Sequence, residues 1–381
     1  MNLFGKENNS ADKKGDQISR KSFLKGLGTL AVSGGVVGAS GYLFSTDADA
    51  SKNVAVNDAT SKKGGIAPAK VKLDTDRVAA DPTDIPAPIR RNHSITHEVT
   101  LESSEVVAEI EPGVSFKYMT FNGQIPGPMI RVRQGDIVRL TLNNVGNSMV
   151  HNIDLHAVYG TGGGADDTRV APGQSRTIEF KTMYPGAFIY HCAVSNMDYH
   201  ISSGMFGMIV VEPKEGLPKV DQELYLGQNE IYTDKKTGEK GFHNFSFDNM
   251  AAENPTYVLL NGEKHALTDA VHGAIKAQSG QKVRVFMVNG GPNLTSSFHP
   301  IGNVWTKAWN EGAVLSTPSQ YVQTLPVPPG STAMLEMDLP LAQKVKLVDH
   351  ALSRVARKGM LGIIDVKGDP RPDIFNPNVN A

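Results

Sequence analysis

Asp136–Leu142 reads DIVRLTL, and from Val138 onward every second residue is apolar. Asparagine and glycine at residues 143–147 then indicate a turn. Lys282–Val288 (KVRVFMV) repeats this pattern in the second half of the chain and stops at the glycine-rich residues 289–291. Short alternating stretches that end at turn residues predict β-strands with one buried face.

Other marks recur in the two halves. The matched pairs are Asn122-Gly123 with Asn261-Gly262, Pro172-Gly173 with Pro329-Gly330, and Gly204–Ile209 (GMFGMI) with Gly359–Ile364 (GMLGII). This repeat, in a chain of 381 residues with 38 glycines and 22 prolines, predicts an all-β protein. We expect two tandem Greek-key β-sandwich domains, at residues 86–215 and 216–370, and a C-terminal tail at 371–381.

The N-terminal region differs in composition. In residues 1–50, basic Ser19–Lys25 precedes a weakly apolar stretch, and small residues suited to cleavage follow at Ala48–Ala50. This order predicts an export signal, or else an uncleaved membrane anchor. We therefore expect an exported protein, periplasmic or otherwise extracytoplasmic, or one that its N-terminus holds at a membrane. Residues 51–85 lack periodicity, which predicts a disordered linker.

Composition excludes several classes. The formal net charge of −1 gives no indication of nucleic-acid binding. The single cysteine excludes internal disulfides and a c-type haem.

That single cysteine, Cys192, stands beside metal-ligand residues. His200 follows it by eight residues, and Met205 follows five residues later. A thiolate, an imidazole and a thioether are ligands of a blue-copper (type 1) site, which needs one more imidazole. His151 is the upstream candidate for that imidazole.

His191, directly before Cys192, predicts a second metal. Adjacent side chains of a strand point to opposite faces, so His191 would face another ion, on the order of 12 Å from the first. The odd offset between His151 and His156 likewise assigns His156 to His191. The repeat places His350 at the position of Cys192, either as a remnant of a decayed copy or as a third imidazole. Three imidazoles on copper leave a position open for substrate.

Asp154 shares the face of His156 by even spacing. A carboxylate beside an open metal position can hold an oxygen ligand and relay protons, although an exposed or turn-capping aspartate is the alternative. The other histidines are expected at the surface: His93, His97, His243, His265 and His272.

Over about residues 90–368 the chain resembles the copper-containing nitrite reductases of the two-domain cupredoxin type. The motifs that carry the resemblance are His151-x4-His156 with Asp154 between, His191-Cys192, His200-x4-Met205, Phe298-His299-Pro300-Ile301 and a lone His350. The resemblance implies two cupredoxin-like domains with one type 1 and one type 2 copper per chain. The implied type 1 ligands are His151, Cys192, His200 and Met205. The implied type 2 ligands are His156, His191 and, from a neighbouring subunit of a homotrimer, His350.

The resemblance also implies the activity. Asp154 and His299 would be the catalytic acid pair, and Ile301 would shape how nitrite binds. The reaction would be dissimilatory one-electron reduction of nitrite to nitric oxide, in denitrification or nitrate assimilation, with a small cytochrome c or cupredoxin as electron donor.

Two alternatives have different copper requirements. A blue-copper electron-transfer protein with a non-catalytic second domain would bind one copper per chain. A multicopper oxidase needs eight imidazoles, largely from His-x-His pairs, and the chain has no such pair.

Overall fold

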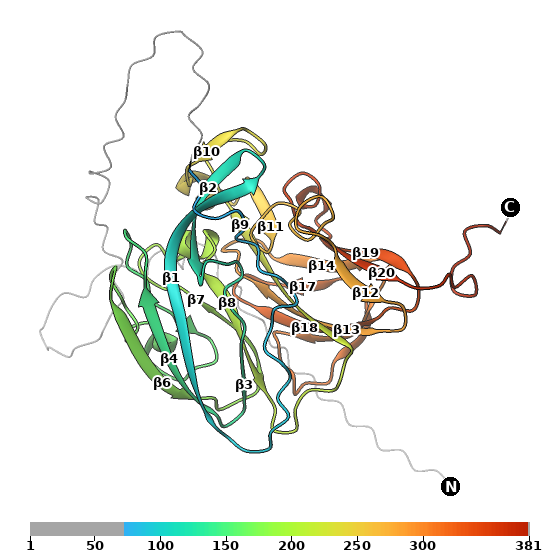
Figure 1. The fold of residues 1–381 in the computed structure, drawn as a ribbon, viewed down its shortest axis with the longest axis horizontal. Helices are drawn as coiled ribbons and strands as arrows, with labels where there is room; N and C mark the ends of the chain where they lie inside the picture. The colour runs from blue at the N-terminus through green and yellow to red at the C-terminus, as the bar shows by residue number, and fades with distance from the viewer. Residues whose placement is uncertain (1–71, 380–381) are drawn as a thin grey trace, which may run out of the picture. The chain divides into compact units, whose positions relative to one another are not determined.

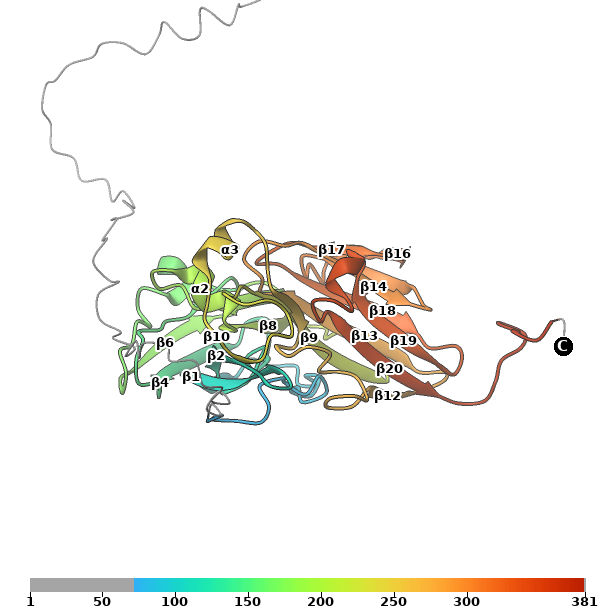
Figure 2. The same ribbon diagram turned by 90° about the horizontal axis from the view of Figure 1, so that it is seen from above.

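A computed structural model describes residues 72–379, which form an all-β body with only short helical turns (Figures 1 and 2). The fold class expected from the alternating pattern is thus confirmed. The expected export signal and residues 51–71 of the expected linker lie outside this range. Within it, no helix has the length and apolar character needed to cross a membrane.

The first half of the body contains two sheets. A five-stranded sheet has the order β10 (Gly241–His243), β2 (Val114–Phe121), β1 (Thr96–Glu111), β4 (Ile137–Asn144), β6 (Ser175–Lys181). A four-stranded sheet has the order β3 (Ile130–Arg133), β8 (Phe206–Glu212), β7 (Gly186–His191), β5 (Asp154–Leu155). The helical turn η1 (Thr161–Gly164) lies between β5 and β6, and α2 (Met197–Ser202) lies between β7 and β8.

The second half repeats this plan. One sheet has the order β11 (Tyr257–Leu260), β9 (Gln222–Ile231), β13 (Lys282–Asn289), β18 (Thr332–Asp338), β15 (Trp305–Asn310), β16 (Ser319–Val322). The other has the order β12 (Ile275–Gln278), β20 (Leu361–Lys367), β19 (Gln343–Asp349), β14 (Ser296–Ile301), β17 (Leu325–Val327). The helical turns of the second half are α3 (Phe247–Ala251), between β10 and β11, and η2 (Leu352–Arg354), between β19 and β20. The predicted domain limit at residues 215–216 falls between β8 and β9, and the domain division stays a prediction.

Asn144 and Asn289, the last residues of β4 and β13, show the repeat in atomic detail. The Asn144 amide donates hydrogen bonds to the carbonyls of Met149 (2.8 Å) and Val170 (3.0 Å). The Asn289 amide donates at 2.8 Å to two carbonyls at corresponding places in the second half, those of Leu294 and Val327. Buried amides rarely lack partners, so both asparagines fix the loop that leaves the strand.

Apolar side chains gather in three clusters. One lies inside the first sandwich and includes Val138, Leu140 and Leu142. A second lies inside the other sandwich and includes Val283, Val285 and Met287. A third joins residues of both halves, such as Phe206 and Phe286. Because burial of one such side chain stabilises a fold by about 1.5–3 kcal/mol relative to exposure, the alternating faces account for the sandwiches.

The expectation of a disordered linker is wrong for residues 72–85. Val78 is 1% exposed. Its backbone N–H donates to Oε1 of Glu263 at 2.7 Å, and its carbonyl accepts from Ile125 N–H at 2.8 Å. The segment therefore contacts both halves. Composition could not predict this order, because the partners that satisfy its peptide groups lie far along the chain.

Candidate metal centres

The structure brings His151, Cys192 and His200 together in the first sandwich. Sγ of Cys192 lies 3.9 Å from Nδ1 of His151 and 3.5 Å from Nδ1 of His200. The three side chains come from different places: the bridge between residues 151 and 170, the position just after β7, and α2. All three are buried, so water does not compete for their donor atoms.

Met205 is tied to the same group through the backbone. Cys192 N–H donates to the Met205 carbonyl, and Met205 N–H donates to the His200 carbonyl, each at 3.1 Å. The Met205 side chain is fully buried. The connection from β7 to β8, which includes α2, thereby holds three of the four expected type 1 residues in one compact segment.

Burial sets the charges of this group. It raises the pKa of the Cys192 thiol to about 11. Burial, and then the neighbouring His151, lower the pKa of His200 to about 4. At neutral pH the His200 imidazole is uncharged and has a lone pair for a metal, whereas the thiol must lose its proton on binding one.

His156, His191 and Asp154 form a second group. The Nε2 atoms of His156 and His191 lie 3.1 Å apart, and Oδ2 of Asp154 lies 3.9 Å from Nε2 of His191. Nδ1 of His191 donates to the Cys192 carbonyl at 3.0 Å, which turns Nε2 toward His156. Burial lowers the pKa of His191. Among residues 72–379, this group and the Cys192 group are the two clusters with metal-ligand spacing.

The expectation that His151 and His156 lie on one continuous strand is wrong. Only Asp154–Leu155 of this segment is a strand, and His151 lies in an isolated bridge with Val170. The two histidines nevertheless lie in different groups.

A glycine run makes room for Asp154. A Cβ on Gly163 would overlap Oδ1 of Asp154 and come within 2.9 Å of the Leu155 carbonyl. Gly163 has a φ of +60°, in the left-handed region that favours glycine. We did not single out this residue from the sequence, although residues 162–164 are the only run of three glycines in the chain.

His299 and His350 lie beside each other in the second half, with ring centroids 5.1 Å apart. Nδ1 of His299 donates to the Gln323 carbonyl at 2.6 Å. His350 is exposed, and Ile301 is 38% exposed. In the described part of the chain, neither histidine joins the groups around Cys192 and His191. One chain does not bring the three expected type 2 imidazoles together.

The strand register corrects the alignment of the two halves. Asp154 pairs with His191, which pairs with Phe206. In the second half, His299 pairs with Val348, which pairs with Leu361. Val348 therefore corresponds to His191. The expectation that His350 occupies the position of Cys192 is wrong by one residue, because Asp349 stands there.

One of the remaining histidines was also placed wrongly. His243 is fully buried rather than at the surface. Its Nε2 donates to the Glu239 carbonyl at 2.7 Å, and its Nδ1 lies 3.0 Å from Oγ1 of Thr233. These are structural contacts.

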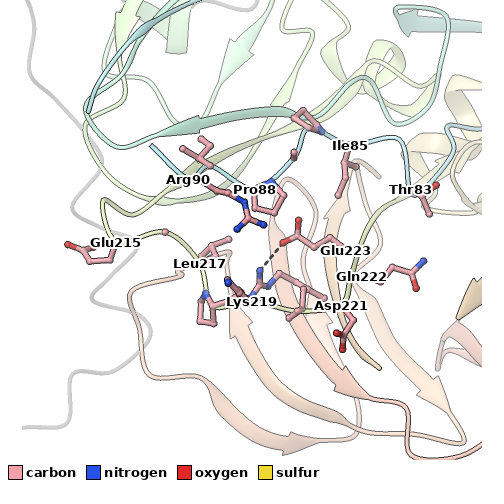
Figure 3. A pocket seen from close by; sticks show the side chains of 17 residues that line it. Thr83, Ile85, Pro88, Arg90, Glu215, Leu217, Lys219, Asp221, Gln222 and Glu223 are labelled. Carbon is pink, nitrogen blue, oxygen red and sulfur yellow. Dashed lines mark hydrogen bonds and ion pairs between the residues drawn. The ribbon is translucent and has the colours of Figure 1, made fainter. Parts of the chain in front are cut away.

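A cavity of about 610 Å³ lies apart from both groups (Figure 3). It is lined by Thr83, residues 85–90, residues 215–223 and Arg284, and the Arg284–Glu223 ion pair (2.8 Å) lies at its wall. None of the histidines in the two candidate metal groups lines this cavity. The cavity is therefore not the place where those groups would act.

Comparison with known proteins identifies the group to which the chain belongs. A multicopper oxidase family model matches residues 103–216. The copper-containing nitrite reductase of Neisseria meningitidis serogroup B is 42% identical over 306 residues, which is 80% of this chain and 77% of that protein. The solved copper nitrite reductase of Nitrosomonas europaea superimposes with a TM-score of 0.63 at 30% identity, covering 73% of this chain and 96% of that chain. That of Thermus scotoductus gives a TM-score of 0.62 at 31% identity, covering 73% and 63%.

Tandem β-sandwiches, with a buried His-Cys-His group in the first, define a copper oxidoreductase of the cupredoxin class. Within that class the chain belongs to the copper-containing nitrite reductase family.

Proposed function

We propose that this protein reduces nitrite to nitric oxide. One electron and two protons convert nitrite to nitric oxide and one water, with cleavage of one N–O bond. The observation that carries the proposal is the separation of neighbouring residues into two groups, with Cys192 facing two buried imidazoles and His191 facing another imidazole and a carboxylate.

The donor sets suit two copper ions of different kinds. A buried thiol with two imidazoles and a nearby thioether suits a type 1 site, held by His151, Cys192, His200 and Met205. His156 and His191 offer imidazoles alone and suit a type 2 site, so each chain would hold one copper of each type. Bound copper supplies a one-electron couple and, at an open position, a Lewis acid for an oxyanion.

The protein's own groups connect and complete the sites. The single peptide unit between His191 and Cys192 is the covalent link for the electron. The carboxyl group of Asp154, on the same side as Nε2 of His191, would in its protonated form donate a hydrogen bond to a nitrite oxygen and pass it that proton. His299 would supply the second proton, and its orientation is fixed by the bond to the Gln323 carbonyl.

The second-half residues act across a subunit boundary in this proposal. His350 and His299 are exposed or half-buried and lie together outside the two groups. A neighbouring copy of the chain, in a homotrimer, would bring His350 to His156 and His191, and Ile301 over the open position. The donor would be a small cytochrome c or cupredoxin. The enzyme would act outside the cytoplasm, after export or at a membrane, in denitrification or nitrate assimilation.

The test is copper analysis with an electron paramagnetic resonance spectrum, followed by a nitrite-dependent nitric oxide assay. We expect two coppers per chain, overlapping type 1 and type 2 signals, and nitric oxide formation only with nitrite and a reductant. A single copper per chain with only the type 1 signal would instead identify an electron carrier.

A further inference from the structure

Each half buries one glutamate at the same place. Ser103 of β1 pairs with Asn144 of β4, and Gln228 of β9 pairs with Asn289 of β13. Since Asn144 and Asn289 correspond, the residues two positions further along β1 and β9 correspond as well. These residues are Glu105 and Glu230.

The two carboxylates share one role. Oε2 of Glu105 accepts a hydrogen bond from Asn147 N–H at 3.2 Å, and Oε1 of Glu230 accepts one from Leu294 N–H at 2.6 Å. Both donors lie in the loop after the corresponding asparagine. In both halves, therefore, the glutamate holds the loop that leads into the next strand.

Only the glutamate of the first half also contacts a metal-ligand residue. Oε1 of Glu105 lies 3.3 Å from Nε2 of His151. Glu230 instead accepts from the hydroxyl of Tyr232, and Ser296 stands at the position of His151. The Glu105 side chain is 2% exposed, so water does not screen the contact.

Both oxygens of Glu105 lie against nitrogen atoms. Oε2 accepts from Asn147 N–H at 3.2 Å, and Oε1 lies 3.3 Å from Nε2 of His151. Hydrogen bonds donated to both oxygens of a carboxyl group favour its ionised form, so an anion faces the imidazole in the first half.

The geometry gives this anion a consequence at the copper. Nδ1 of His151 faces Sγ of Cys192, whereas Nε2 faces Glu105. An Nε2–H that donates to a carboxylate fixes the tautomer that leaves Nδ1 free for a metal and makes the imidazole a stronger donor. A stronger donor and a buried negative charge both favour the oxidised, more highly charged ion.

We propose that Glu105 is a positioning residue, which orients His151 and lowers the reduction potential of the type 1 copper. This rests on the proposed type 1 site. The proposal adds Glu105 of β1, 46 positions before His151 in the sequence, to the residues of that site.

The test compares Glu105→Gln with Glu230→Gln in the copper-loaded full chain. Glutamine keeps an acceptor for the loop N–H and removes the charge. The type 1 potential is measured by spectroelectrochemistry and the site geometry by electron paramagnetic resonance. We expect a higher potential and altered copper hyperfine splitting in Glu105→Gln, and unchanged values in Glu230→Gln.

Other outcomes separate the two roles. An unchanged potential in Glu105→Gln, or equal shifts in both variants, would overturn the proposal and leave only the loop role. If Glu105→Gln loses the type 1 copper, Glu105→Asp decides: recovery of copper there, with Glu230→Gln fully loaded, supports positioning of His151, and equal loss in all three overturns it. A wild-type protein without any type 1 signal would refute the proposed function itself, whatever the variants do.

Discussion

The two halves of the body share a common strand plan, to which the second half adds further strands, and they differ in the residues at equivalent positions. His151 and Cys192 of the first half correspond to Ser296 and Asp349 of the second. Asp349 is buried and pairs with Arg354 at 2.6 Å. The second sandwich thus carries an ion pair where the first carries a thiol. The same position of the fold can therefore hold either a candidate metal ligand or a residue with a structural contact.

Two other equivalent positions carry proposed site residues in both halves. The register places His299 at the position of Asp154, and Ile301 at that of His156. The two proposed proton donors are therefore one position used twice, once as a carboxylate and once as an imidazole. Duplication, followed by divergence at a few positions, would supply both sides of a site that two copies of the chain share.

Replacing Cys192 by alanine has the largest expected effect. It removes the thiolate while His151 and His200 remain, so the strong visible absorption and the type 1 signal should vanish. Activity driven by a protein donor should fall by more than about 100-fold, beyond the roughly 10–100-fold cost of losing an outer-shell partner. The type 2 signal should persist. Loss of both signals would mean that the two groups are one site.

Asp154→Asn should keep both coppers but lose turnover. The amide retains a hydrogen-bond donor and acceptor but cannot deliver a proton at neutral pH, so we expect a fall of about 100–10,000-fold, the range for general acid–base catalysis. Steady-state nitric oxide formation is measured alongside copper content. A fully active, fully loaded variant would remove Asp154 from the mechanism.

Gly163→Ala tests whether backbone shape positions that carboxylate. Its methyl group would occupy the space of Oδ1 of Asp154. A displacement of about 1 Å can cost on the order of 100-fold in rate. Gly162→Ala is the matched control, because φ is +54° there and its added Cβ would meet only ordinary contacts. An equal loss of activity in the two variants would show that strain in the loop, not the contact with Asp154, matters. Wild-type activity in Gly163→Ala would show that neither matters.

The smallest effect on function is expected at the second-half position equivalent to Cys192. Asp349→Asn keeps an acceptor for Ser297 N–H and Ala351 N–H but loses the charge that pairs with Arg354. Losing one charge-assisted hydrogen bond costs about 2 kcal/mol. Denaturant unfolding should show this loss, whereas the type 1 copper content and spectrum stay unchanged. A changed type 1 spectrum would mean that the second half also contributes to the type 1 site.

Local sequence patterns predicted the fold class, but they did not predict most of the details of the fold. Alternation at Asp136–Leu142 and Lys282–Val288 predicted the strands, and the repeated motifs predicted the duplication. The alignment slipped by one residue at His350, because sequence matching does not determine strand register, and a one-residue slip exchanges the two faces of a strand. The ordered segment 72–85 was missed because its partners, such as Glu263, are distant in sequence.

The candidate site shows the same division. Residues with rare chemistry, such as Cys192 and the histidines near it, could be selected from type and spacing. Glu105 and Gly163 could not, since a glutamate in a strand and a glycine in a loop are common. Only the approach of β1 to His151, and of the glycine turn to Asp154, gives these two residues a role.

Anomalous X-ray diffraction at the copper edge, on crystals of fully metallated protein, tests the difference between the halves most directly. Two peaks per chain should appear, one among His151, Cys192 and His200 and the other at His156 and His191, on the order of 12 Å apart. No third peak per chain should appear at the Asp349 carboxylate. One peak shared by His191 and Cys192, or a vacant His156–His191 pair, would contradict the account.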